Sequence, residues 1–138
     1  MTSDLLRTAI AVDKSMDAGA VANASAIVMG QLARLEDRIY ADDVRDADSA
    51  LHAGIRFNTL VLSGRSSHLT ALAQAARAEG LPTVLFTAQG QSLSNSFDAY
   101  RDLVARAAPG ELGVCAVGVV GEHELVRTLT NRFSVYRG

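Results

Sequence analysis

Five polar side chains lie at or just beyond apolar stretches of the chain and could together bind a small polar or anionic ligand: Asp13, Lys14, Asn23, Thr87 and Gln89. The ammonium of Lys14 could hold an anionic group, and the Asn23 amide could orient a ligand as both donor and acceptor. A plainer alternative stays open. Asn23 would then satisfy backbone groups of the preceding loop, and Asp13 and Lys14 would be solvated surface residues.

The apolar stretches predict strands, and the segments between them have the three-to-four-residue apolar period of helices. We expect strands at residues 7–12, 58–63, 83–87 and 112–120, and helices at 20–35, 67–79, 97–107 and 121–129. Alternating strands and helices predict one α/β domain over residues 1–138, a three-layer α/β/α sandwich with a four-stranded mixed, mostly parallel sheet. Residues 133–136 are a candidate additional edge strand.

This fold would position the five polar side chains. In open α/β sheets, ligands bind at the carboxyl ends of the strands, where loops converge and helix N-termini supply backbone donors. Asp13 follows the first strand and Thr87 ends the third, so both are expected at that edge. The polar segment 88–96 is a candidate lid or binding loop. Within residues 36–57, residues 38–44 are a candidate short edge segment, and the rest is expected to be a loop or irregular hairpin.

Nucleophilic chemistry is weakly indicated. Ser66 precedes His68 by two positions, which places the two side chains on different sides of a helix, so a serine hydrolase is disfavoured. The turn at residues 64–67 could cradle a phosphate or carboxylate through backbone donors and hydroxyls, but the favoured interpretation is that Ser66 caps the helix. Cys115 lies in an apolar strand, where a thiol is ordinarily an inert core residue. It is the only cysteine of the chain.

A metal site is also disfavoured. The segment with Asp42, Asp43, Asp46 and Asp48 lacks the glycine and the bidentate glutamate of a calcium loop. The three histidines, at positions 52, 68 and 123, fall on different predicted elements. We therefore expect no metal and no cofactor.

Composition and charge indicate which classes of partner the protein does not bind and where in the cell it is located. The formal net charge is −2, and the twelve arginines are scattered singly, so the basic face typical of nucleic-acid binding is absent. The apolar stretches are far shorter than the roughly 20 residues of a membrane span, and the start of the chain lacks the basic segment of a signal peptide. With one cysteine, these features predict a cytoplasmic protein that binds neither nucleic acid nor membrane.

Two motifs give the chain a family resemblance. The sequence Gly-Ala-Val-Ala-Asn-Ala at residues 19–24 and the segment 115–126 resemble the first helix and the last strand and helix of type II peptidyl-tRNA hydrolases. A closer resemblance is to an uncharacterised bacterial branch, domain of unknown function 2000, which has an Asn in the first helix, as at Asn23. That branch also has an Asp-rich segment ending in His-x-Gly-Ile, as at residues 46–55. The resemblance covers nearly the whole chain and implies the hydrolase-like fold and a homodimer.

The departures from the hydrolase pattern decide the functional prediction. The lysine and glutamine of that family's first helix fall on Ala20 and Ala24, and the segment 87–91 contains no carboxylate. Peptidyl-tRNA hydrolysis is therefore not expected, and we predict a non-hydrolase relative that binds a small polar or anionic ligand. Two alternatives stay open: a hydrolase or transferase with a rearranged site using Lys14 and Asp13, and a structural or interaction module without a ligand.

Overall fold

A computed structural model describes residues 5–93 and 95–138 of the chain, which form a mixed α/β fold around one five-stranded sheet. The strand order is β5-β6-β1-β4-β7. The strands are β1 (Leu6–Asp13), β4 (Thr59–Gly64), β5 (Thr83–Thr87), β6 (Val114–Glu122) and β7 (Ser134–Val135). Four of them match the predicted strands, and β7 is the candidate edge strand at the end of the chain.

The sheet corrects two parts of the prediction. It has five strands rather than four, because the short terminal segment pairs with β4. It is also not mostly parallel, since β1 and β4 run parallel whereas β6 lies antiparallel to both β1 and β5. The reason is that the chain between β5 and β6 stays at one end of the sheet: the Ala88 amide, just after β5, donates to the Gly113 carbonyl, just before β6. Without a crossover to the other end, β6 must run back antiparallel.

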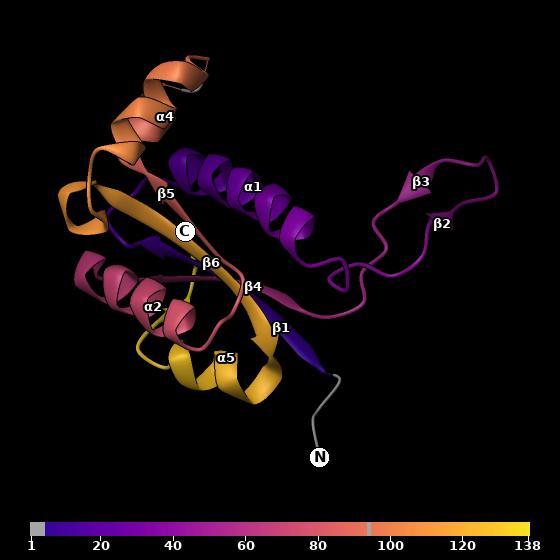
Figure 1. Ribbon diagram of the computed structural model, residues 1–138. Helices are drawn as coiled ribbons and strands as arrows, with labels where there is room; N and C mark the ends of the chain where they lie inside the picture. The colour runs from indigo at the N-terminus through magenta and orange to yellow at the C-terminus, as the bar shows by residue number, and fades with distance from the viewer. Residues whose placement is uncertain (1–4, 94) are drawn as a thin grey trace.

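Helices cover both faces of this sheet (Figure 1). Helix α1 (Ala18–Leu35) packs on one face, and α2 (Ser66–Ala78) and α5 (His123–Leu129) pack on the other. The remaining helical segments, α3 (Ala88–Ser92), α4 (Phe97–Ala105) and the 3₁₀ turn η1 (Pro109–Glu111), connect β5 to β6. The predicted polar loop therefore begins with the short helix α3, and its residue 94 lies outside the described residues.

The alternation of β1 divides the core into two halves. Ile10 and Val12 pack with the buried face of α1, whereas Ala9 and Ala11 pack beneath α2 and α5. Successive strand residues point to opposite sheet faces, so a strand that is apolar throughout is buried on both sides. The small alanines face the side that carries two helices.

Helix α1 lies very close to the central strand β6. Gly118 of β6 faces α1, and a Cβ built there would stand 2.4 Å from Val28 Cγ1 and 2.7 Å from Leu32 Cδ1. The helix begins at Asp17, whose Oδ1 accepts from the Ala20 amide at 2.8 Å, as expected of an N-cap. Its helical residues cover the predicted residues 20–35 and begin two residues earlier, at Ala18.

A two-stranded arm projects from the body beyond the end of α1 (Figure 1). It is formed by β2 (Val44–Arg45) and β3 (Leu51–His52), which pair antiparallel. Asp46 organises its turn: Oδ1 accepts from the amides of Asp48 and Ala50, and Oδ2 lies 2.7 Å from His52 Nε2. The irregular hairpin predicted within residues 36–57 is confirmed.

None of the helices in the described ranges combines the length and the apolar character that a bilayer crossing requires.

Candidate functional site

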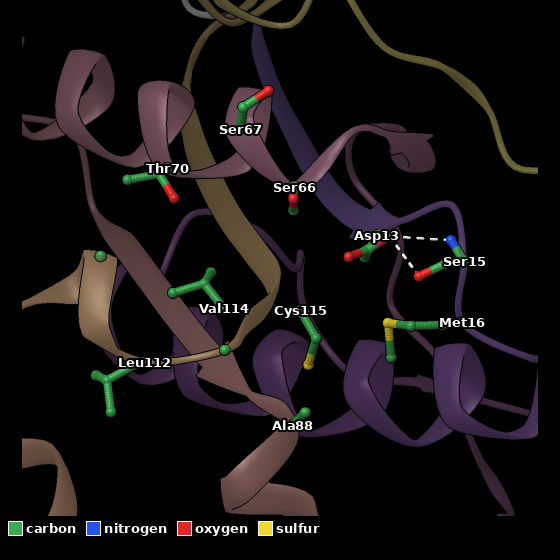
Figure 2. Close-up of a pocket in the computed structure, with 12 residues that line it drawn as sticks. Asp13, Ser15, Met16, Ser66, Ser67, Thr70, Ala88, Leu112, Val114 and Cys115 are labelled. Carbon is green, nitrogen blue, oxygen red and sulfur yellow. Dashed lines mark hydrogen bonds between the residues drawn. The ribbon is translucent and has the colours of Figure 1, made fainter.

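A cavity of about 440 Å³ lies where β1 and β5 end and where α2 and β6 begin. Figure 2 shows its walls: Asp13 and the following turn on one side, the first turns of α2 above, and the start of β6 opposite. The lining residues are Asp13, Ser15, Met16, Ser66, Ser67, Thr70, Ala88, Gly110, Leu112, Gly113, Val114 and Cys115.

The chain topology explains why a cavity forms at this place. Helix α1 leads from β1 to β4 over one face of the sheet, and α2 leads from β4 to β5 over the other. Strands β4 and β5 lie on opposite sides of β1, so the connections diverge at the carboxyl end of β1. Such a switch point leaves a crevice between the diverging loops, and α/β proteins bind ligands there.

Asp13 is the one carboxylate that lines the cavity among the described residues. Its Oδ1 accepts from the amide of Ser15 at 2.9 Å and from the Ser15 hydroxyl at 2.8 Å, which fixes the carboxylate in place. No described residue donates to its Oδ2. A ligand with an N–H or O–H group could therefore meet a preoriented acceptor.

The start of α2, which lies above the cavity in Figure 2, supplies hydroxyl groups to its wall. Ser66 and Thr70, one helical turn apart, have their hydroxyls on the side of α2 toward β6, whereas the Ser67 hydroxyl points away (Figure 2). The prediction that Ser66 caps this helix is wrong, because Arg65 is the N-cap residue and its side chain makes no capping hydrogen bond. Ser66 is instead the first helical residue, which leaves its side chain free to face the cavity.

Cys115 forms part of the floor and does not behave as a nucleophile. Its side chain is buried, with 4% of the residue exposed. Burial raises the pKa of the Cys115 thiol to about 11, and the negative charge of Asp13 contributes in the same direction. The thiol is therefore protonated at neutral pH, and the thiolate that nucleophilic attack requires is scarce.

The structure separates the five residues predicted for the site. Asp13 lines the cavity, and Gln89 supports its wall, since Gln89 Oε1 accepts from the Gly113 amide at 3.0 Å. Thr87 is 3% exposed and caps α3, its hydroxyl accepting from the Gly90 amide at 2.9 Å. Lys14 lies in a second cavity, on the β4 side of the sheet.

Asn23 is exposed and is not among the residues that line the cavity. Positions 21, 24 and 28 form the buried face of α1, and residue 23 lies off that face because each helical residue turns the chain by about 100°. Its Oδ1 accepts from Gln91 Nε2 at 3.3 Å, and the same amide group donates to the Ala20 carbonyl at 3.1 Å. Asn23 thus helps to join α3 to the start of α1.

Sequence reasoning missed Thr70 and Gly113 as parts of the cavity, and it favoured a helix cap over a ligand contact for Ser66. One signal was available: hydroxyl residues at positions 66 and 70 share one face at the start of a helix that follows a strand. Gly113 carried no such signal, because its place in the wall depends on how the long β5–β6 connection folds. No group of three or more His, Cys, Asp or Glu side chains in residues 5–93 and 95–138 could hold a metal ion.

Comparison with known proteins supports the fold and the family. The protein of unknown function Atu0240 from Agrobacterium tumefaciens strain C58 has a similar structure, with a TM-score of 0.84 at 14% sequence identity, covering 96% of this chain and 98% of that one. No curated protein matches the chain. The family model described as "Protein of unknown function (DUF2000)" matches residues 6–137, and the chain therefore belongs to this family.

Proposed function

We propose that this protein binds a small polar molecule in the cavity at the carboxyl end of β1, and that it is a non-hydrolase relative of type II peptidyl-tRNA hydrolases with their three-layer arrangement. The observation that carries the binding proposal is the preoriented Asp13 carboxylate, which lines a cavity of about 440 Å³ together with residues at the start of α2 that carry hydroxyl groups. That volume falls within the range of small-molecule sites. The ligand should carry at least one N–H or O–H group to donate to Asp13 Oδ2.

The arrangement of the walls favours binding over covalent chemistry. The Cys115 thiol is protonated at neutral pH, and no hydrogen bond joins Ser66 or Thr70 to a histidine in the described part of the chain. Backbone amides at the uncapped start of α2 add hydrogen-bond donors to the hydroxyls. The site can therefore present donors and acceptors to one ligand without an activated nucleophile.

Two positions that differ from the hydrolase pattern have structural roles here. Ala24 lies on the buried face of α1 and is fully buried, and the Ala20 carbonyl accepts from Gln91 of α3. Helix α3 itself occupies the segment 87–91, which contains no carboxylate. These contacts support the view that this edge of the fold has been rebuilt without the hydrolase's lysine and glutamine.

A ligand screen by thermal shift tests the binding proposal. The panel should contain neutral and cationic molecules with donor groups: amino acids, amino sugars, nucleosides and polyols. A ligand at 100 times its Kd stabilises the folded state by about 2.7 kcal/mol, which is a shift of several degrees for a chain of this length. The same hits are then titrated against Asp13→Asn, Ser66→Ala and Ser96→Ala.

Ser96→Ala is the matched control, because it removes a hydroxyl of the same type from an exposed position outside the cavity lining. We expect Asp13→Asn and Ser66→Ala to weaken binding and Ser96→Ala to leave it unchanged. If no compound shifts the wild type, or if a hit binds all three variants equally well, the cavity is not the binding site that we propose.

A second candidate function, an interaction module, is favoured by the arm. Val44, Leu51 and Ile55 are 50%, 59% and 74% exposed, and a two-stranded hairpin without a covering layer is marginal in water. We propose that the arm contacts a second copy in a homodimer of a cytoplasmic protein.

Light scattering after size exclusion should give twice the chain mass for the wild type and the chain mass for Leu51→Asp. Phe97→Asp, at an exposed apolar site on α4, should remain dimeric. A monomeric wild type would overturn this candidate.

A further inference from the structure

A second cavity, of about 490 Å³, lies on the other side of the β1–β4 pair and is lined by positively charged side chains. Three separate segments meet there: the turn after β1, the junction of β4 with α2, and the approach to β7. The lining residues are Lys14, Ser63, Gly64, Arg65, His68, Arg132 and Ser134. We propose that this cationic cavity binds the phosphate group of a small phosphorylated molecule, independently of the polar ligand proposed above.

The charges of the cavity are uncompensated. Within residues 5–93 and 95–138, no carboxylate forms an ion pair with Lys14, Arg65 or Arg132. Five arginine–carboxylate contacts and two histidine–carboxylate contacts occur elsewhere in that part of the chain. No Asp or Glu is among the lining residues. Arg65 adds a positive charge at the N-cap of α2, where the helix dipole already favours negative groups. A bound anion would relieve this concentration of positive charge.

Fixed contacts hold the cavity open and its segments together. The Lys14 amide donates to the Gly64 carbonyl at 2.9 Å, which ties the turn after β1 to the end of β4. Ser63 and Ser134 are paired directly across β4 and β7, so their hydroxyls lie side by side.

The aromatic ring of Phe133 packs against Gly64 and His68, two of the residues that line the cavity. A Cβ at Gly64 would stand 2.5 Å from Phe133 Cδ1, so the ring packs directly on the glycine backbone. The His68 ring meets Phe133 edge-on, with centroids 6.3 Å apart. Arg132 and Ser134, the neighbours of Phe133 in the sequence, are thereby placed beside the cavity.

These groups match a phosphate better than a carboxylate. Two guanidinium groups can each give paired N–H···O bonds to phosphate oxygens, and the ammonium supplies a compact positive charge. The two serine hydroxyls can donate to remaining oxygens. A volume of about 490 Å³ exceeds that of a phosphate ion, so the cavity has room for part of the molecule that carries it.

Titration with inorganic phosphate, pyrophosphate and a phosphorylated sugar, followed by calorimetry and thermal shift, tests the proposal. Ionic strength is held constant with sodium chloride. Lys14→Gln and Arg132→Gln each remove one charge from the cavity, and Arg56→Gln, at an exposed arginine outside it, is the matched control. We expect each cavity variant to bind about tenfold more weakly, the effect of losing one charge-assisted hydrogen bond, and Arg56→Gln to bind like the wild type.

The pattern of binding distinguishes the sources of the phosphate. Tighter binding of the phosphorylated sugar or of pyrophosphate than of inorganic phosphate supports a phosphorylated metabolite. Equal stabilisation by sodium chloride alone, equal weakening in Arg56→Gln, or tighter binding of a single-stranded RNA than of any small phosphate would overturn it. Because Asp13→Asn should leave phosphate binding intact, failure of the polar-ligand site and failure of this site are distinguishable.

Discussion

Replacement of Gly118 by alanine tests how closely α1 packs on β6. The added Cβ would lie 2.4 Å from Val28 Cγ1, within a fully buried contact. Valine is stiff at χ1 and cannot swing this methyl group away, so the helix or the strand must shift. Overpacking of this kind costs roughly 1–3 kcal/mol, and the reduced freedom of the unfolded chain offsets about 0.4–1 kcal/mol. We expect a net loss of about 1–2 kcal/mol.

The loss should be visible in both chemical and thermal unfolding. An unfolding entropy of roughly 2.1 cal/mol/K per residue gives about 290 cal/mol/K for this chain, so Tm should fall by roughly 3–7 °C. The chain has no tryptophan, so urea unfolding is best followed by far-ultraviolet circular dichroism. The slope m should stay unchanged, which would show that stability and not compactness has changed.

A matched glycine and a second substitution isolate the contact. Gly30 lies on the exposed side of α1 with nothing within 4 Å of its built Cβ, so Gly30→Ala should stabilise the protein by about 0.5–1 kcal/mol. In a Val28→Ala background, Gly118→Ala should cost about 1 kcal/mol less than in the wild type. If Gly118→Ala is as stable as the wild type, or if the two substitutions are additive, α1 does not pack on β6 in the way described.

Three further predictions concern the cavity wall, its thiol and the arm. Gln89→Ala removes the hydrogen bond to the Gly113 amide, so it should cost about 0.5–1.5 kcal/mol and speed hydrogen exchange at Gly113. The pKa of Cys115 is raised above its ordinary value of 9.0 to about 11. The wild type should therefore lose stability between pH 9 and 11 relative to Cys115→Ala, as measured by urea midpoints. Hydrogen bonding to His52 lowers the pKa of Asp46, so the arm's stabilisation should persist above about pH 4 and fade below it. Amide chemical shifts of the arm should follow this transition in the wild type and lack it in Asp46→Asn.

Local signals in the sequence predict the individual elements well. Strand β5 occupies the predicted residues 83–87, and α1 ends at the predicted residue, Leu35. Gly80 ends α2 with a φ of +74°, as expected of a glycine after a helix. These features depend on contacts within a few residues of one another, which is why composition and periodicity reveal them.

Strand direction could not be predicted in the same way. The apolar pattern of β6 indicates burial on both faces, and a parallel or an antiparallel central strand satisfies it equally. The direction depends instead on the path of residues 88–113, whose end returns to its start through the bond from the Ala88 amide to the Gly113 carbonyl. A connection that contains helices had indicated a crossover, but here its helices remain at one edge of the sheet.

The separation of Asp13 from Lys14 bears most directly on the enzyme alternative. Adjacent residues in extended chain project in different directions, and Asp13 is the last residue of β1. Its carboxylate enters the cavity beside α2 and β6, and the Lys14 side chain enters the one beside β7. The bond from the Lys14 amide to the Gly64 carbonyl holds this divergence in place. A mechanism that used both groups on one substrate would have to break that bond and turn the strand end. The two binding sites that we propose, one for a hydrogen-bond donor group and one for a phosphate, would use the two side chains in the positions that the structure gives them.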